Sequence, residues 1–335
     1  MLNVGLLGAR RIALVHAKAI SSHPGSRLVA VSDVNTAAAE TLAAQFGAEA
    51  RATDAILADP GIDAVLIATS TDTHADLIEA AAAAGKAVLC EKPVHLDLQR
   101  ALRCRAVAAA TGKPVMIGFN RRFDPNFAAL KAAADAGEIG KTELLSVTSF
   151  DPAPPPVSYI KVSGGLFRDM MIHDFDMAMW IMGAVPARVT AVGSSIVDPE
   201  IGAAGDVDTA VVTLHFADGR IAVIKNSRRA VYGYDQRLEL LGADGLLQAQ
   251  NMLENTVVKS TTAGVSSAKP TWFFLERYMP AYEAEWAAFV EAVASEKALP
   301  VTLQDGINAL ALAEAATLSV QSGETVAVTP EMLGA

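Results

Sequence analysis

The 335-residue sequence has few of the residues that mark several large protein classes. Its two cysteines, Cys90 and Cys104, indicate neither a disulfide framework nor a zinc motif. Charged residues make up 19% and the net charge is -10, which disfavours binding to nucleic acid or to anionic membranes. No apolar run approaches the roughly 18 residues that span a bilayer, and residues 1–8 lack the regions of a signal peptide. We therefore expect a cytoplasmic protein with reduced thiols.

The sequence does have abundant apolar material, 52% of its residues, and a length that suggests two domains. Over residues 1–120, short apolar runs alternate with helical patterns. Continuous apolar strands between helices are typical of a parallel sheet covered on both faces. We predict an N-terminal Rossmann domain, a doubly wound parallel sheet, over residues 1–120. Its predicted strands are residues 3–7, 27–32, 64–68, 87–90 and 115–118.

The pattern changes in residues 121–335. The segment 187–250 alternates like antiparallel strands, and Asp218-Gly219 and Asp244-Gly245 are strong turn signals. We predict a C-terminal α+β domain on a large, mostly antiparallel sheet, for substrate binding and oligomerisation. Its last helix, about 304–319, is expected to pack back on the first domain. The other predicted helices cover residues 127–136, 167–182 and 276–294, and residues 143–149 form a further predicted strand.

The first predicted strand is followed by Gly8-Ala9-Arg10-Arg11-Ile12-Ala13. This run occupies the place of the G-x-G-x-x-G turn, which sets a pyrophosphate at a helix N-terminus. Ala13 is a tolerated variant of the third glycine, whereas Arg10 departs from the second. Arg10 points away from the pyrophosphate, pairs with it, or obstructs it, and the sequence leaves these three alternatives open.

Asp33 ends the next strand, where an acidic side chain accepts hydrogen bonds from the adenosine ribose. A carboxylate at this place would repel a 2'-phosphate, so we expect NAD rather than NADP as the cofactor. Two alternatives stay open: Asp33 is a helix N-cap or turn residue, or the domain binds no nucleotide.

Three other residues point to chemistry. Lys92 follows a parallel strand, where ligands of such sheets gather, although a lysine there is also commonly a solvated charge. Asp169 and His173 lie four apart in the predicted helix 167–182 and so share one face. Such a pair can stabilise a helix, bind a metal, or act as an acid/base unit.

Four motifs together resemble the glucose–fructose oxidoreductase/inositol dehydrogenase (Gfo/Idh/MocA) superfamily, and within it the bacterial inositol 2-dehydrogenases most. The match continues into Asn226-Ser227-Arg228-Arg229 and Tyr232-Gly233-Tyr234-Asp235, and it covers nearly the whole chain. The four motifs are Gly8 to Ile12, Cys90-Glu91-Lys92-Pro93, Gly118 to Asp124, and Gly164 to Asp176.

The resemblance implies roles for individual residues. It makes Lys92, Asp169 and His173 the catalytic set, with His173 as the general base, and it implies no metal. His74 is implied near the cofactor, although it also suits a helix start, and Asp151 and Ser149 differ from some relatives. The implied cofactor-binding residues are Gly8, Arg10, Arg11, Ile12, Asp33, Thr69, Ser70, His74, Glu91, Lys92 and Asn120. The implied substrate-binding residues are Lys92, Arg122, Asp151, Asp169, His173 and Tyr234.

The residue types suit oxidation of a secondary alcohol. A neutral imidazole accepts the hydroxyl proton, and an ammonium stabilises the developing alkoxide. We therefore expect NAD-dependent oxidation of myo- or scyllo-inositol to the keto-inositol, by a homo-oligomer, either a dimer or a tetramer. The alternatives are an aldose 1-dehydrogenase, a glycosidase that retains its NAD, and a non-catalytic sensor of sugar or dinucleotide.

Overall fold

The computed structural model describes residues 1–334, which form two compact units. Unit 1 comprises Met1–Phe123, Pro280–Leu310 and the chain from Glu331, and unit 2 comprises Asp124–Met279 and Ala311–Pro330. This division differs from the boundary drawn at residue 120, chiefly because Pro280–Leu310 belongs to unit 1.

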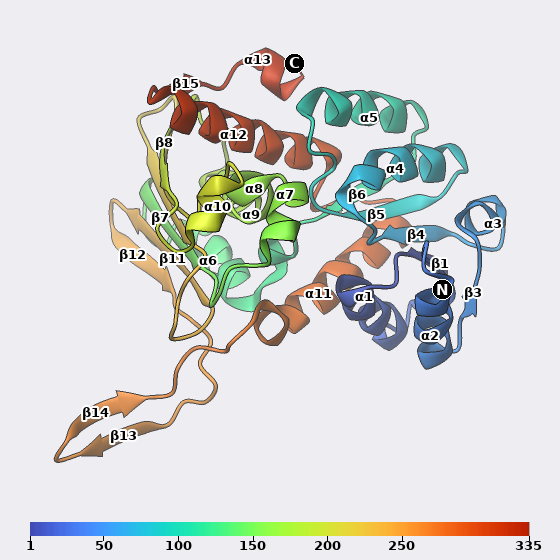
Figure 1. Ribbon diagram of the computed structural model, residues 1–335, viewed down its shortest axis with the longest axis horizontal. Coiled ribbons are helices and arrows are strands. Elements are labelled where there is room, and N and C mark those ends of the chain that lie inside the picture. The colour runs from blue at the N-terminus through green and yellow to red at the C-terminus, as the bar shows by residue number, and fades with distance from the viewer. Residues whose placement is uncertain (335) are drawn as a thin grey trace. The chain divides into compact units, whose positions relative to one another are not determined.

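Unit 1 is built on a six-stranded sheet in the order β3-β2-β1-β4-β5-β6. All of its strand pairs are parallel, as predicted from the buried apolar runs. Figure 1 shows α4 and α5 on one side of this sheet and α1 and α2 on the other. The strands are β1 (Leu2–Leu7), β2 (Ser26–Ser32), β3 (Glu49–Ala50), β4 (Ala64–Ile67), β5 (Ala87–Glu91) and β6 (Val115–Gly118). The helices are α1 (Arg11–Ser22), α2 (Thr36–Phe46), α3 (Thr53–Ala58), η1 (Thr71–Thr73), α4 (His74–Ala83), α5 (Leu98–Ala110) and η2 (Asn120–Phe123).

The strand order of unit 1 reverses direction at β1, because β2 lies on one side of it and β4 on the other. Ligands of doubly wound sheets bind outside the carboxyl ends of the strands at such a point. The turns after β1, β2, β4 and β5 meet at that edge of the sheet, and they carry most of the predicted cofactor-binding residues.

Unit 2 contains a seven-stranded sheet in the order β12-β11-β7-β10-β9-β8-β15. Its pairs are antiparallel except for β7 with β10. The predicted fold class, a Rossmann sheet followed by an α+β domain, is thus confirmed. The strands are β7 (Thr142–Phe150), β8 (Arg188–Ser194), β9 (Thr209–His215), β10 (Ile221–Ser227), β11 (Asp235–Gly242), β12 (Gly245–Ala249) and β15 (Val326–Ala327).

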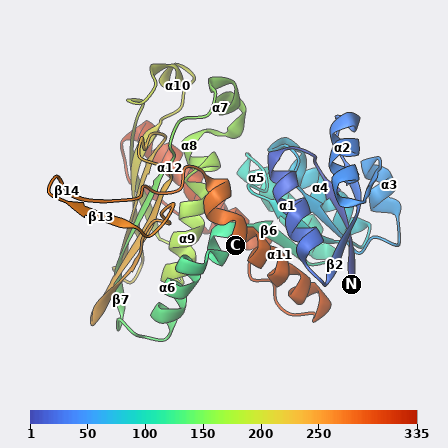
Figure 2. The same cartoon turned by 90° about the horizontal axis from the view of Figure 1, so that it is seen from below.

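Helices α6, α8 and α9 lie on one face of the seven-stranded sheet (Figure 2). Both Asp-Gly signals fall in hairpin turns: Asp218-Gly219 joins β9 to β10, and Asp244 lies in the turn between β11 and β12. The helices of this part are α6 (Pro125–Asp135), α7 (Val157–Ser163), α8 (Gly165–Asp169), α9 (Ile172–Met182) and α10 (Pro199–Ala203). The remaining helices of the chain are α11 (Phe274–Ala294), α12 (Leu303–Ser322) and α13 (Pro330–Leu333).

The predicted helix 167–182 is wrong in one respect, because two helices, α8 and α9, occupy it. The amides of Met170 and Met171 both donate to the carbonyl of Leu166, at 3.0 and 2.9 Å, and this shared acceptor ends the α-helical hydrogen-bond pattern. Asp169 is therefore the last residue of α8 and His173 the second residue of α9. Their spacing does not place them on successive turns of one helix.

A two-stranded hairpin was not predicted. Its strands, β13 (Val258–Thr261) and β14 (Gly264–Ser267), are exposed along their whole length. Figures 1 and 2 show the hairpin extending away from the seven-stranded sheet of unit 2.

Candidate functional site

The turn after β1 is fixed by Gly8 and Asp33. Gly8 has a φ of 108°, and a Cβ atom there would lie 2.4 Å from the carbonyl oxygen of Ala68, so only glycine fits. The Asp33 carboxylate accepts hydrogen bonds from the amide of Ala9 at 2.7 Å and from the amide of Asn35 at 2.8 Å. Asp33 thus ties the turn after β1 to the turn after β2.

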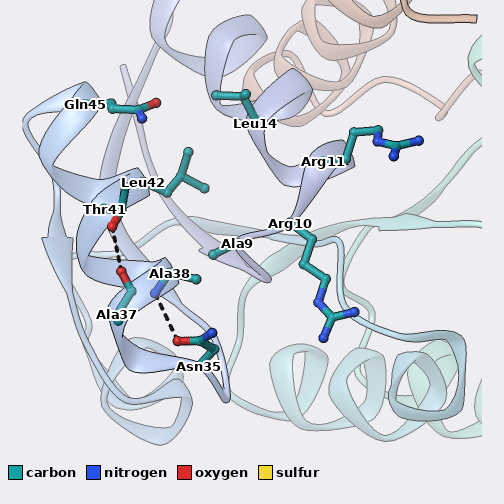
Figure 3. Close-up of a pocket in the computed structure, with 10 residues that line it drawn as sticks. All are labelled: Ala9, Arg10, Arg11, Leu14, Asn35, Ala37, Ala38, Thr41, Leu42 and Gln45. Atoms are coloured by element: carbon teal, nitrogen blue, oxygen red, sulfur yellow. Dashed lines mark hydrogen bonds between the residues drawn. The ribbon is translucent and has the colours of Figure 1, made fainter. Parts of the chain in front are cut away.

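Arg10 occupies the position of the second glycine without backbone strain. Its φ of -93° and ψ of -165° are extended values that any residue adopts, and its side chain is exposed. A glycine at this position would therefore let a ligand come close to the backbone, but the shape of the turn does not require it. Figure 3 shows the side chains of Arg10 and Arg11 directed away from α2, on the far side of a cavity of about 490 Å³. Leu14, Ala38 and Leu42 line this cavity.

The start of α1 suits an anionic cofactor group. Arg10 makes no side-chain capping bond, and the first turn has no acidic residue. By contrast, Asn35 caps α2 and Asp97 caps α5, each by accepting from a backbone amide. The uncapped amides of α1, next to two arginines, fit the pyrophosphate of a dinucleotide.

The turns after β4 and β5 are joined by His74. This buried residue begins α4, and its Nδ1 lies 2.8 Å from the carbonyl oxygen of Pro93, while its Nε2 lies 3.3 Å from that of Thr69. Thr69 also exchanges a hydrogen bond with Thr73 at 2.7 Å, and Ser70 precedes η1. Burial lowers the pKa of His74.

Lys92 follows β5 and is partly exposed, and its bond to Pro93 is cis. The preceding residue, Glu91, is buried and pairs with Nε2 of His16 at 2.7 Å. Glu91 thus has a partner inside the protein that sequence analysis did not foresee. The 8% exposed fraction of Glu91 leaves it little surface for a ligand.

Asn120 and Arg122 lie in η2, just after β6, and both are buried. The Nδ2 atom of Asn120 has no hydrogen-bond partner among the described residues. Arg122 donates to Asp305 at 3.0 Å and to the carbonyl oxygen of Pro300 at 3.1 Å. Burial alone would raise the pKa of Asp305, but Arg122 and Thr302 hold it below its usual value. At least part of the Arg122 guanidinium therefore serves the packing of unit 1.

In unit 2, Asp169 is held by two residues that sequence analysis did not assign. Tyr159 donates to Asp169 Oδ1 at 2.9 Å, and Arg228 donates to Oδ2 at 3.5 Å. Arg228 is 1% exposed, so its charge is almost wholly removed from water. Burial, together with the charge of Asp169, raises the pKa of Tyr159, which therefore stays a protonated donor. His173 follows at the start of α9.

A row of polar side chains crosses the seven-stranded sheet near these residues. Ser149 on β7 has Asn226 of β10 and Gln236 of β11 as cross-strand neighbours, and all three are buried. Asn226 donates to Asp174, beside His173, at 2.9 Å, and Ser149 donates to Gln236 at 3.0 Å. Asn226 Oδ1 and Gln236 Nε2 have no hydrogen-bond partner among the described residues.

The two remaining predicted substrate residues flank this row. Asp151 directly follows β7, and its amide donates to the carbonyl of Ser227 at 2.9 Å. Tyr234 precedes β11 and packs edge-on against Tyr278, with ring centroids 5.9 Å apart. Asp151, Asp169, His173 and Tyr234 thus belong to unit 2, whereas Lys92 and Arg122 belong to unit 1.

The chain is similar to known proteins over nearly its whole length. The family model described as "Oxidoreductase family, NAD-binding Rossmann fold" matches residues 2–119. The model described as "GFO/IDH/MocA C-terminal domain" matches residues 127–248. The inositol 2-dehydrogenase of Rhizobium meliloti (strain 1021) is 49% identical over 324 residues, which is 97% of this chain and 98% of the relative. The chain belongs to the Gfo/Idh/MocA oxidoreductase family.

Two solved structures of this family extend the comparison. Myo-inositol dehydrogenase from Corynebacterium glutamicum ATCC 13032 superposes with a TM-score of 0.95 at 42% identity, covering 98% of this chain and 99% of that chain. Scyllo-inositol dehydrogenase from Lactobacillus casei with bound NAD(H) and scyllo-inositol superposes with a TM-score of 0.90 at 30% identity, with the same coverage.

Family membership identifies the chain as an NAD-dependent dehydrogenase with a dinucleotide site on its Rossmann sheet. Within residues 1–334 no group of three or more His, Cys, Asp or Glu side chains forms a metal site. No helix in that range is long and apolar enough to cross a membrane.

Proposed function

We propose that the protein oxidises a secondary hydroxyl of a cyclic polyol, myo- or scyllo-inositol, to the corresponding keto-inositol. The observation that carries this proposal is the near full-length likeness to dehydrogenases named for inositol, together with Lys92, Asp169 and His173 in this chain.

His173 takes the general-base role. It lies at the start of α9 and is partly exposed, so a substrate hydroxyl can reach it. A neutral imidazole accepts the hydroxyl proton because its ordinary pKa lies near working pH. Asp169 binds the substrate and stabilises the imidazolium that forms. Since Tyr159 and Arg228 fix both of its oxygens, Asp169 stays in one orientation during the reaction.

Lys92 supplies a positive charge to the same hydroxyl. An ammonium group stabilises the alkoxide that develops as the proton leaves, and it orients the reacting carbon toward the cofactor. When bound, NAD would supply the hydride acceptor for this oxidation. Gly8, Asp33 and the uncapped amides of α1 hold the phosphate and ribose end of that cofactor.

We propose NAD as the preferred cofactor over NADP. The Asp33 carboxylate lies at the end of β2 and would repel a 2'-phosphate. The ratio of kcat/KM for the two cofactors measures this preference, and a ratio in favour of NADP would overturn it.

A substrate with several hydroxyl groups suits the polar row of unit 2. Asn226 Oδ1 can accept a hydrogen bond and Gln236 Nε2 can donate one, and each is buried without a protein partner among the described residues. Buried polar groups generally find partners, in protein, water or ligand. A hydroxyl group, or a water bound to it, both donates and accepts.

The test is direct. Purified protein with NAD is mixed with each of a panel of inositols and aldoses, and NADH is followed by its absorbance. We expect turnover with myo- or scyllo-inositol, and loss of most turnover in Lys92→Ala and in His173→Ala with NAD binding largely intact. Higher kcat/KM for an aldose would favour the sugar 1-dehydrogenase alternative. Binding of NAD with no turnover on any compound would favour the sensor.

We further propose that the protein is a homo-oligomer that buries the outer face of the seven-stranded sheet. Leu246, Leu241, Leu144 and Ile221 are consecutive cross-strand neighbours on four adjacent strands, and each is 38–46% exposed. A continuous aliphatic row of this kind on a sheet face marks a protein interface. The exposed hairpin strands β13 and β14 add Val258 and Val265, and an isolated hairpin is marginally stable without further packing.

A further inference from the structure

The residue with the least expected surroundings is His16, on the buried face of α1. It is 1% exposed and lies among the buried apolar residues Ala13, Ala17 and Ile20 of the same helix. Its Nε2 lies 2.7 Å from Oε1 of Glu91, the last residue of β5. A carboxylate only accepts hydrogen bonds, so Nε2 carries the proton and donates it.

Glu91 is a buried anion at the base of the lysine turn. Burial alone would raise the pKa of Glu91, but the hydrogen bond from His16, with the charge of Lys92 nearby, holds that pKa below its usual value. Its second oxygen, Oε2, accepts from the amide of Lys92 at 3.3 Å. The Glu91 carboxylate therefore connects His16 to the backbone of Lys92. Tyr282 packs edge-on against the His16 ring, with centroids 5.4 Å apart, and limits its rotation.

The other end of the turn is held by His74. Its pKa is lowered by burial, so it is neutral and carries one ring proton. The shorter contact, 2.8 Å to the carbonyl of Pro93, places that proton on Nδ1. The three-residue turn Glu91-Lys92-Pro93 is thus fixed at its first residue by His16 and at its last by His74.

We infer that His16 is a positioning residue for Lys92, acting through Glu91. The inference rests on the proposed role of Lys92 in alcohol oxidation. His16 lies on α1, the helix whose uncapped first turn suits the cofactor pyrophosphate. One helix therefore sets both the phosphate end of the cofactor site and the lysine that faces the reacting hydroxyl. Nothing in this role requires His16 to touch substrate or cofactor.

The test compares His16→Gln with His16→Met. Glutamine and methionine have nearly the same length and volume, but only the glutamine amide can donate to Glu91. We expect kcat to fall about tenfold or more in His16→Met, because small displacements of a catalytic group cost this much, while the KM for NAD changes by less than about threefold. His16→Gln should stay within about threefold of wild type. His23→Met, at the end of the same helix, is the matched control and should behave as wild type.

A second readout does not depend on turnover. Acetic anhydride labels lysine side chains at rates set by their surroundings, and peptide mass spectrometry reports the rate at Lys92. This rate should change about threefold or more in His16→Met and remain near wild type in His16→Gln. If the wild-type protein oxidises no inositol or aldose, the proposed function fails, and the labelling comparison still decides the inference.

Two results would overturn the inference. One is wild-type kcat and Lys92 labelling in His16→Met. The other is an equal loss in His16→Gln and His16→Met, which would show that the ring serves packing alone. Should His16→Met fail to fold, the double variant His16→Met/Glu91→Leu removes both members of the buried pair and leaves no unpaired charge. It is expected to fold with low kcat, and wild-type kcat in that variant would also refute the positioning role.

Discussion

Tyr159 and Arg228 hold Asp169, and removing either group should slow turnover. The structure indicates which of the two removals costs more. A hydrogen bond to a charged group contributes about 1.5–3 kcal/mol, but Tyr159 is 47% exposed and water can replace its hydroxyl in Tyr159→Phe. We expect a loss of about 1 kcal/mol in transition-state stabilisation, or about fivefold in kcat/KM for the polyol.

Arg228→Met should cost more, because Arg228 is 1% exposed and water cannot reach the space it leaves. Breaking a buried ion pair costs about 3–5 kcal/mol, but this pair is long at 3.5 Å and the Asp169 side chain is 16% exposed. We therefore expect about 2 kcal/mol, or about 30-fold in kcat/KM. Since both residues act on one carboxylate, the double variant should lose less than the product of the two factors.

Steady-state kinetics with the substrate found in the panel would measure these effects, with NADH binding and thermal unfolding recorded for each variant. Arg229→Met is the matched control, because Arg229 is the next residue and is exposed. The pKa of Tyr159 is raised, so its phenol remains protonated up to its ordinary pKa and beyond. The effect of Tyr159→Phe should therefore be constant between about pH 6 and about pH 9. Wild-type kcat/KM in Arg228→Met, or a loss no larger than in Arg229→Met, would refute the reasoning.

Three further predictions concern the cofactor turn and the sheet surface. Gly8→Ala should abolish NAD binding or folding, because the added Cβ would lie 2.4 Å from the Ala68 carbonyl oxygen. A soluble Gly8→Ala variant that binds NAD with normal affinity in a titration would contradict this. Arg10→Ala should weaken NAD binding about threefold at low salt and less at high salt, since an exposed cation pairs weakly with phosphate. Tighter NAD binding in this variant would show that Arg10 obstructs the site. Leu241→Asp should shift the protein to smaller assemblies in size-exclusion chromatography with light scattering, because it places a charge in the aliphatic row; an unchanged mass would place the interface elsewhere.

Much of the fold followed from local patterns. Five of the six parallel strands of unit 1, all except β3, were predicted because each is a short, continuous apolar run between helices. The two Asp-Gly turns of unit 2 were predicted because few other sequences suit tight hairpins. Hairpin β13–β14 was not predicted. It has no buried face in one chain, so it lacks the alternation of apolar and polar residues that marks a half-buried strand.

The break between α8 and α9 lay beyond sequence reasoning for a different reason. Residues 167–182 form an unbroken helical pattern, and neither Met170 nor Met171 is a helix breaker. The start of α8 is fixed from 40 residues away, where the Asp206 carboxylate accepts from the amide of Leu166 at 3.0 and 3.1 Å. A contact of this sequence separation leaves no periodic signal.

The same distinction applies to Asp33, for which sequence analysis gave ribose binding and a cap or turn role as alternatives and not as joint tasks. The structure gives its carboxylate a second task, because its two oxygens accept from the amides of Ala9 and Asn35. An ionised carboxylate has about four lone-pair positions, so two remain for ribose hydroxyls. The residue that recognises the cofactor therefore also shapes the turn that receives its phosphates. In the same way, Glu91 and Asp169 are each held by a buried partner far along the chain. The motifs mark where the chemistry lies, whereas distant contacts, which no motif contains, keep those side chains in place.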